Sequence, residues 1–107
     1  MKPVDRLLQD MLGAIEAIES YSVPTYQVFL KDQRTQDAIM YNLIILGEAA
    51  NKIQEDFQRS HPEIPWDDVI GTRHVIVHGY DHVRLQIVWD ILEKDLHSLK
   101  LKIQKLL

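Results

Sequence analysis

The chain has 107 residues, a net charge of −4 and no cysteine. This length fits one domain, which we place at residues 1–107. The lack of cysteine excludes disulfides, thiolate metal sites and cysteine nucleophiles, and it suits a reducing cytoplasm. A core of this size is thin, so we expect a homodimer or a higher homo-oligomer.

Charge is distributed unevenly along the chain. Residues 1–70 carry six Lys or Arg against twelve Asp or Glu, a net of −6, whereas residues 71–107 carry six against four, a net of +2. The overall negative charge argues against holding nucleic acid by bulk electrostatics, so a polyanion should meet the C-terminal third. The longest strongly apolar run, Leu43 to Leu46, is too short to cross a membrane, and we expect a cytoplasmic protein.

The first segment is predicted to be an amphipathic helix. Its apolar residues recur at the spacing that forms one stripe on a helix of 3.6 residues per turn, namely Val4, Leu7, Leu8, Met11, Leu12, Ile15 and Ile18. Ser22, Pro24 and Thr25 are expected to break it.

A second helix is predicted from about Asp32 to Phe57. Between Ala38 and Ala50 it is apolar nearly all round, so it needs cover on more than one face, and a second copy of the chain could supply that cover. The small residues Gly47, Ala49 and Ala50 leave room for close helix packing.

Two further helices complete the predicted fold. The stretch 60–65 contains two prolines and is a connector, after which Pro65 opens a helix that runs to about His78, where Gly79 ends it. A long amphipathic helix follows, with its stripe at Leu85, Val88, Leu92, Leu96, Leu99, Ile103 and Leu106. We therefore predict an all-α fold, an antiparallel bundle of about four helices.

The residues most suited to chemistry are concentrated between positions 71 and 83. This segment holds three of the five histidines, an arginine and a tyrosine. Arg73, His78 and Tyr80 in it follow the spacing R-x-x-x-x-H-x-Y.

That spacing resembles the motif of HEPN ribonuclease toxins, specifically the HepT-like branch. Four flanking segments resemble the same branch in the same order: Thr35-Gln36-Asp37-Ala38, Gly47-Glu48-Ala49-Ala50-Asn51, Pro62-Glu63-Ile64-Pro65-Trp66 and Ile87-Val88-Trp89-Asp90. The resemblance covers almost the whole chain. One departure is His74, at a position where the family often has asparagine.

The resemblance implies a single, dimeric HEPN domain with a metal-independent ribonuclease site shared between two copies. It implies the toxin of a type VII-like toxin–antitoxin system, with RNA (tRNA is one candidate) as substrate and Arg73 and His78 as catalytic residues. It also implies a minimal nucleotidyltransferase antitoxin as partner, which attaches AMP to Tyr80. No cofactor and no membrane contact are implied.

The residue types suit that chemistry. Histidine, with an ordinary pKa of about 6.5, exchanges protons near neutral pH, whereas arginine stays charged and offers a planar fork of donors to phosphate. The expected products of this cleavage are a 2′,3′-cyclic phosphate and a free 5′-hydroxyl. On a helix, Arg73 and His78 are roughly 140° apart around the axis, so one copy alone is expected to be a poor catalyst.

Several residues have a functional and a structural interpretation. His74 could position RNA, and Glu48 and Asn51 could support the site or satisfy each other. His74, His78 and His82 would align a zinc site on one helix, but Gly79 should end the helix before His82, so we expect no metal site.

Two tryptophans and four lysines also have both a structural and a functional interpretation. Trp66 and Trp89 are expected as core or interface anchors, and four lysines as a solvated face or an RNA contact: Lys94, Lys100, Lys102 and Lys105. The alternative function is a non-catalytic module that presents a nucleotide or a substrate to a nucleotidyltransferase. A third is a purely structural helical bundle.

Overall fold

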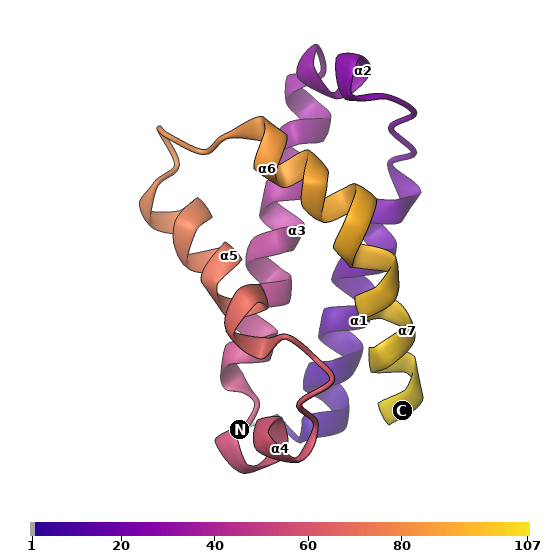
Figure 1. Cartoon of the computed structure of the whole chain (residues 1–107), viewed down its shortest axis with the longest axis vertical. Coiled ribbons are helices and arrows are strands. Elements are labelled where there is room, and N and C mark those ends of the chain that lie inside the picture. Colours follow the sequence, from indigo (N-terminus) through magenta and orange to yellow (C-terminus); the bar gives the residue numbers. More distant parts are fainter. Residues whose placement is uncertain (1) are drawn as a thin grey trace.

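The computed structural model describes residues 2–107, and within them every regular element is helical. Figure 1 shows the long elements running alternately up and down, so that the chain forms an antiparallel bundle and the predicted all-α class is confirmed. The elements are α1 (Val4–Ser20), α2 (Tyr26–Leu30), α3 (Gln33–Lys52), α4 (Glu55–Ser60), α5 (Trp66–His78), α6 (Leu85–Asp90), the π-helical turn η1 (Ile91–Asp95) and α7 (Leu96–Leu106).

Helix α1 matches the predicted amphipathic helix. Most of its predicted stripe is buried, and Leu8, Met11 and Ile15 are completely so. This stripe packs mainly against α3, which is the central helix of the bundle and also carries α5 on another side.

A short helix, α2, was not predicted after the Ser22–Thr25 break. The hydroxyl of Thr25 accepts a hydrogen bond from the backbone N–H of Val28 and so caps its first turn. Phe29 is fully buried, and the Gln36 side-chain amide donates to its carbonyl oxygen. Tertiary burial of one ring therefore stabilises a helix too short to form alone.

The prediction of one helix to Phe57 was wrong, because α3 ends at Lys52 and α4 begins at Glu55. Ile53 adopts an extended backbone (φ −73°, ψ 132°), which buries its side chain in the core. The Gln58 amide donates to the carbonyl oxygens of Ala50 and Ile53 and so helps to satisfy the backbone at this break.

The predicted start and end of α5 are confirmed. Pro65 precedes its first residue, Trp66, and Gly79 follows its last, His78. Gly79 has a φ of −116°, so its role is not a left-handed conformation. Instead, a Cβ at this position would lie 2.9 Å from the Val75 carbonyl oxygen, which receives the Gly79 N–H.

The C-terminal stripe forms one rod, but with a wide turn inside it. Helices α6 and α7 are joined through η1, a π-helical turn, where a single uninterrupted α-helix was predicted. Val88, Leu96, Leu99 and Ile103 are buried on both sides of this turn. A π-helical turn holds more residues than an α-helical turn, and with it both parts of the apolar stripe face the core.

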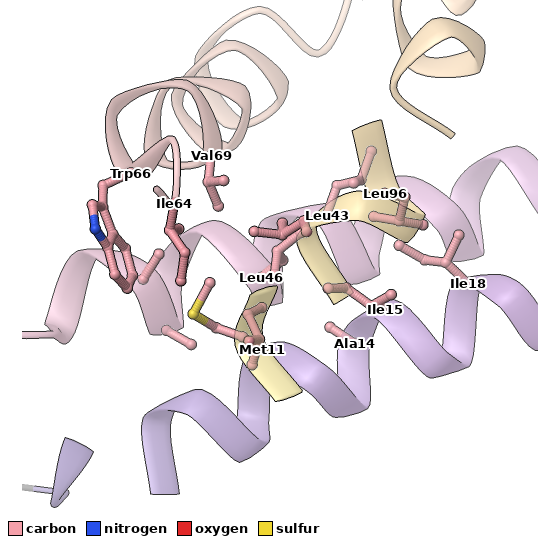
Figure 2. Close-up of a cluster of buried hydrophobic side chains, with 14 of the residues drawn as sticks. Met11, Ala14, Ile15, Ile18, Leu43, Leu46, Ile64, Trp66, Val69 and Leu96 are labelled. Atoms are coloured by element: carbon pink, nitrogen blue, oxygen red, sulfur yellow. The ribbon is translucent and has the colours of Figure 1, made fainter. Parts of the chain in front are cut away.

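The core lies where the long helices meet. Figure 2 shows side chains of α1, α3, α5 and α7 converging, with Met11, Leu43, Val69 and Leu96 among them. Ile64, in the connector before α5, also points into this cluster. Within residues 2–107, none of the helices combines the length and apolar character needed to span a bilayer.

Candidate active site

Arg73 lies where α5 crosses α3 at close range. Its contact on α3 is Gly47, and a Cβ added there would overlap the Cβ of Arg73 and lie 3.1 Å from its Cγ. The same Cβ would lie 3.1 Å from the carbonyl oxygen of Val69, one turn earlier on α5. The absence of a side chain at Gly47 therefore allows the two helices to approach closely, and it places the Cβ of Arg73 against α3.

Glu48, the next residue on α3, forms an ion pair with the Arg73 guanidinium. Both side chains are about one-third exposed, 29% for Arg73 and 35% for Glu48. The carboxylate therefore holds the guanidinium in place while part of it still faces solvent. In the part of the chain described, Glu48 is paired with Arg73, and no hydrogen bond joins it to Asn51. Asn51 is exposed near the end of α3.

One nitrogen of Arg73 is unusual. Its Nε atom is buried and has no hydrogen-bond partner among residues 2–107. Buried donors are normally paired, and those that are not often mark a site where a partner or a water belongs. The guanidinium thus has donor capacity left over after binding Glu48.

His74 and His78 lie on the exposed side of α5. Their rings are neighbours, with centroids 4.5 Å apart and planes tilted by 49°. Within residues 2–107 neither ring takes part in a hydrogen bond or an ion pair. The other three histidines differ, because each has a carboxylate oxygen within 4.0 Å: His61 near Glu63, His82 near Asp81 and His97 near Glu19.

Tyr80 lies in the turn directly after α5 and is 81% exposed. Residues 2–107 leave most of its ring uncovered, so the structural interpretation of a packed tyrosine does not fit this side chain. Its hydroxyl is reachable from solvent, two residues from His78.

Arg73 and His78 have different surroundings within one chain. Arg73 is turned toward α3 by Gly47 and Glu48, whereas His78 faces solvent. This agrees with the wide angular separation expected from their five-residue spacing.

The other predicted candidates lie away from this region or have structural contacts. Trp66 is buried and its indole N–H donates to the His61 carbonyl oxygen at 3.0 Å, while Trp89 packs its ring on Phe29 and Tyr26. Lys100 is paired with Glu19 at 2.7 Å, and this hydrogen bond raises the pKa of the lysine.

A recess lies between α5 and α7, and neither Arg73 nor His78 lines it. It has a volume of about 200 Å³ and an apolar floor that includes Leu43, Leu46 and Leu99, with Lys94 and Lys102 at its edge. Lys105 is exposed and lies outside it.

Gly47 is the residue whose role at this site the sequence did not predict. Its smallness was noted as room for helix packing, but the specific contact with Arg73 depends on where α5 crosses α3. The available signal was the Gly47-Glu48 pair within a segment that resembles the HepT-like branch.

Comparison with known proteins places the chain in a family. The family described as "Ribonuclease HepT-like" matches residues 11–106. The chain is 40% identical to the "Probable ribonuclease HepT" of Thermococcus cleftensis, across 92% of this chain and 91% of that protein. It is 34% identical to a "Putative RNase" of Methanocaldococcus jannaschii, across 85% of this chain and 76% of that protein.

A protein of Caldanaerobacter subterraneus that also carries the name "Putative RNase" is 27% identical, across 97% of this chain and 90% of its own length. No solved structure matches the chain. The all-helical fold is the one that the resemblance to this family predicted. The chain belongs to the HepT-like ribonuclease family.

Proposed function

We propose that this protein is a ribonuclease that cleaves RNA without a metal ion, using Arg73 and His78. The observation that carries the proposal is the placement of Arg73, which Gly47 and Glu48 hold at the surface with part of its guanidinium free. His78 follows on the same helix with an unpaired, exposed ring. Phosphodiester transfer needs at least a fixed cation and a free imidazole at one phosphate, and Arg73 and His78 supply these two groups.

The reaction would proceed by attack of the RNA 2′-oxygen on the adjacent phosphorus. A base removes the 2′-hydroxyl proton, the bond from phosphorus to the 5′-oxygen breaks, and an acid gives that oxygen a proton. His78 would exchange protons, and Arg73 would stabilise the negative phosphorane oxygens. The products are a 2′,3′-cyclic phosphate and a 5′-hydroxyl end.

We place the complete site between two copies of the chain. One copy turns Arg73 and His78 to different sides, so a two-fold interface is needed to bring cations and imidazoles to one phosphate. Helix α3 offers a half-covered apolar face for this contact, with Ile44 and Ile45 half-buried and Tyr41 64% exposed. Val75, on α5 next to His74, is 57% exposed.

We assign the protein to a toxin–antitoxin pair, with a minimal nucleotidyltransferase as its antitoxin. Tyr80 would be the control point, because its hydroxyl is exposed and lies two residues from His78. An AMP group attached there adds bulk and negative charge where the RNA phosphate must approach. Modification would therefore block substrate binding, and the cell would be protected.

The proposal is tested with purified protein and total tRNA in the presence of EDTA. We expect cleavage by the wild-type protein and at least about a hundredfold slower cleavage by His78→Ala, since general acid–base catalysis contributes about that factor or more. His97→Ala is the matched control, because it removes an exposed histidine on α7. Cleavage that His78→Ala leaves intact would refute the assignment.

A further inference from the structure

The two histidines on α5 have the arrangement of a chelating pair. They are four residues apart on one helix, so their side chains project from the same face, one turn above the other. Two histidines at this spacing are a recurrent way for a helix to bind a transition metal. The structure adds that the rings are already neighbours, with centroids 4.5 Å apart.

The distances suit a metal ion. Imidazole nitrogens bind Zn²⁺ at about 2.0–2.1 Å, and tetrahedral geometry then places two ligand nitrogens about 3.4 Å apart. Because a ring nitrogen lies off its centroid, rotation about the side-chain torsions brings two nitrogens of His74 and His78 to that separation.

Neither ring has a competing partner. The carboxylates beside His61, His82 and His97 have no counterpart at His74 or His78 within residues 2–107. The positive charge of the neighbouring Arg73 is offset by Glu48, which reduces its repulsion of a cation. The lone pairs of both rings are therefore available to a metal.

We propose that His74 and His78 chelate a borderline transition-metal ion such as Zn²⁺, Ni²⁺ or Cu²⁺, and that the bound ion inhibits the protein. Water would fill the remaining coordination positions, because residues 2–107 contain no group of three or more His, Asp or Glu side chains that could enclose an ion. His82 is excluded as a third ligand, since it lies beyond Gly79 and beside Asp81.

Inhibition follows because the metal ion and the proton compete for one lone pair of electrons on His78. A metal on His78 occupies the nitrogen lone pair with which that ring would accept a proton from RNA. This consequence rests on the proposed ribonuclease function, whereas binding of the ion does not. The site is regulatory in this account, and it is consistent with cleavage that needs no metal.

Metal binding is tested directly, without RNA, by isothermal titration of the full-length chain with Ni²⁺ and Zn²⁺ alone. We expect one ion per chain, and at least about tenfold weaker binding in His74→Ala and in His78→Ala, since each removes half of the ligand set. His82→Ala and His97→Ala are matched controls and should bind as the wild type does. Circular dichroism checks that each variant keeps its helices.

Two further measurements sharpen the result. The electron paramagnetic resonance spectrum of bound Cu²⁺ should show coupling to two imidazole nitrogens, and affinity should rise from Co²⁺ through Ni²⁺ to Cu²⁺. Mg²⁺ and Ca²⁺, which prefer oxygen ligands, should not bind this pair. Absence of binding to the wild type, or equal binding by His74→Ala or His78→Ala, would overturn the proposal.

Inhibition is measured on RNA cleavage, each protein being compared with its own metal-free rate. Zn²⁺ should slow the wild-type protein, and EDTA should restore the rate. A protein that binds the ion but never cleaves RNA would keep the metal site and refute the ribonuclease. A protein that cleaves RNA but binds no ion would keep the ribonuclease function and refute the metal site.

Discussion

At the scale of single residues, the site depends on one glycine. Gly47 allows Arg73 to lie against α3, and its neighbour Glu48 then binds the guanidinium. The sequence motif identified Arg73, His78 and Tyr80, but it could not reveal which partner holds the arginine. That partner is on a different helix, 25 positions earlier in the chain, and only the crossing of α3 and α5 brings it close.

Gly47→Ala should destabilise the fold and lower activity together. The added methyl overlaps the Cβ of Arg73, and overpacking of this kind costs about 1–3 kcal/mol in the free energy of unfolding. Gly71→Ala is the matched control on α5, since a Cβ there meets no atom within 4 Å. It should be neutral or stabilising by up to about 1 kcal/mol. Urea unfolding measures the stability of each variant, and RNA cleavage measures its activity. Equal stability and activity of the two variants would contradict this role of Gly47.

The Glu48–Arg73 pair should show coupling in a double-mutant cycle. Both side chains are partly exposed, so we expect about 1 kcal/mol or less between Glu48→Gln and Arg73→Lys in unfolding free energy. Lys2 and Asp10, a more exposed pair at 2.8 Å, provide the comparison. Strictly additive effects of the two substitutions would show that Glu48 does not hold Arg73.

At the scale of helices, periodicity predicted the elements that carry long apolar stripes. It found α1 and the C-terminal rod because each presents one face to the core over several turns, whereas α5 was located by Pro65 and Gly79 at its ends. It missed α2, whose five residues depend on the burial of Phe29. It also missed the break at Ile53, because an apolar residue there continues the helical pattern although its backbone is extended.

Helix α3 begins with a cap, Asp32, that should make the stability of the protein depend on pH. Asp32 accepts hydrogen bonds from the hydroxyl and the backbone N–H of Thr35, which lower the pKa of its carboxyl below the ordinary 3.8. A lowered folded-state pKa stabilises the protein above the unfolded-state pKa, and this contribution is lost as the pH falls through the folded-state pKa.

Asp32→Ala should therefore lower the melting temperature at pH 7, and the difference from the wild type should shrink in acid below pH 3.8. Asp32→Asn keeps an acceptor for the N–H of Thr35 without the charge, so it should lose less at pH 7. Thermal unfolding followed by circular dichroism at both pH values measures this. A difference that stays constant with pH would contradict the role of the charged carboxylate.

At the scale of the whole molecule, the bundle leaves one apolar face of α3 half-covered. The sequence predicted that α3 needs cover on more than one side, and α1 and α5 supply only part of it. The part of α3 that they leave uncovered includes Tyr41, Ile44 and Ile45, and we propose that a second copy of the chain covers it. The shape of that interface could not be predicted, because periodicity locates a face without locating its partner.

Tyr41→Asp should give a monomer with its helices intact and with little cleavage activity. The side chain is 64% exposed, so the substitution should spare the fold of one copy while placing a charge in an apolar contact. Leu101→Asp is the matched control, since Leu101 is an exposed apolar residue on α7, outside this face. Analytical ultracentrifugation measures the oligomeric state, and a Tyr41→Asp protein that remains a dimer would argue for another interface.

Arg73 and His78 are proposed to cleave RNA by 2′-hydroxyl attack without a metal ion. Mass spectrometry of the ends produced from a defined RNA in EDTA tests it most directly. We predict 2′,3′-cyclic phosphate and 5′-hydroxyl ends from the wild-type protein, and none above background from Arg73→Ala or His78→Ala. Products with 5′-phosphate ends, or identical products from all three proteins, would contradict it.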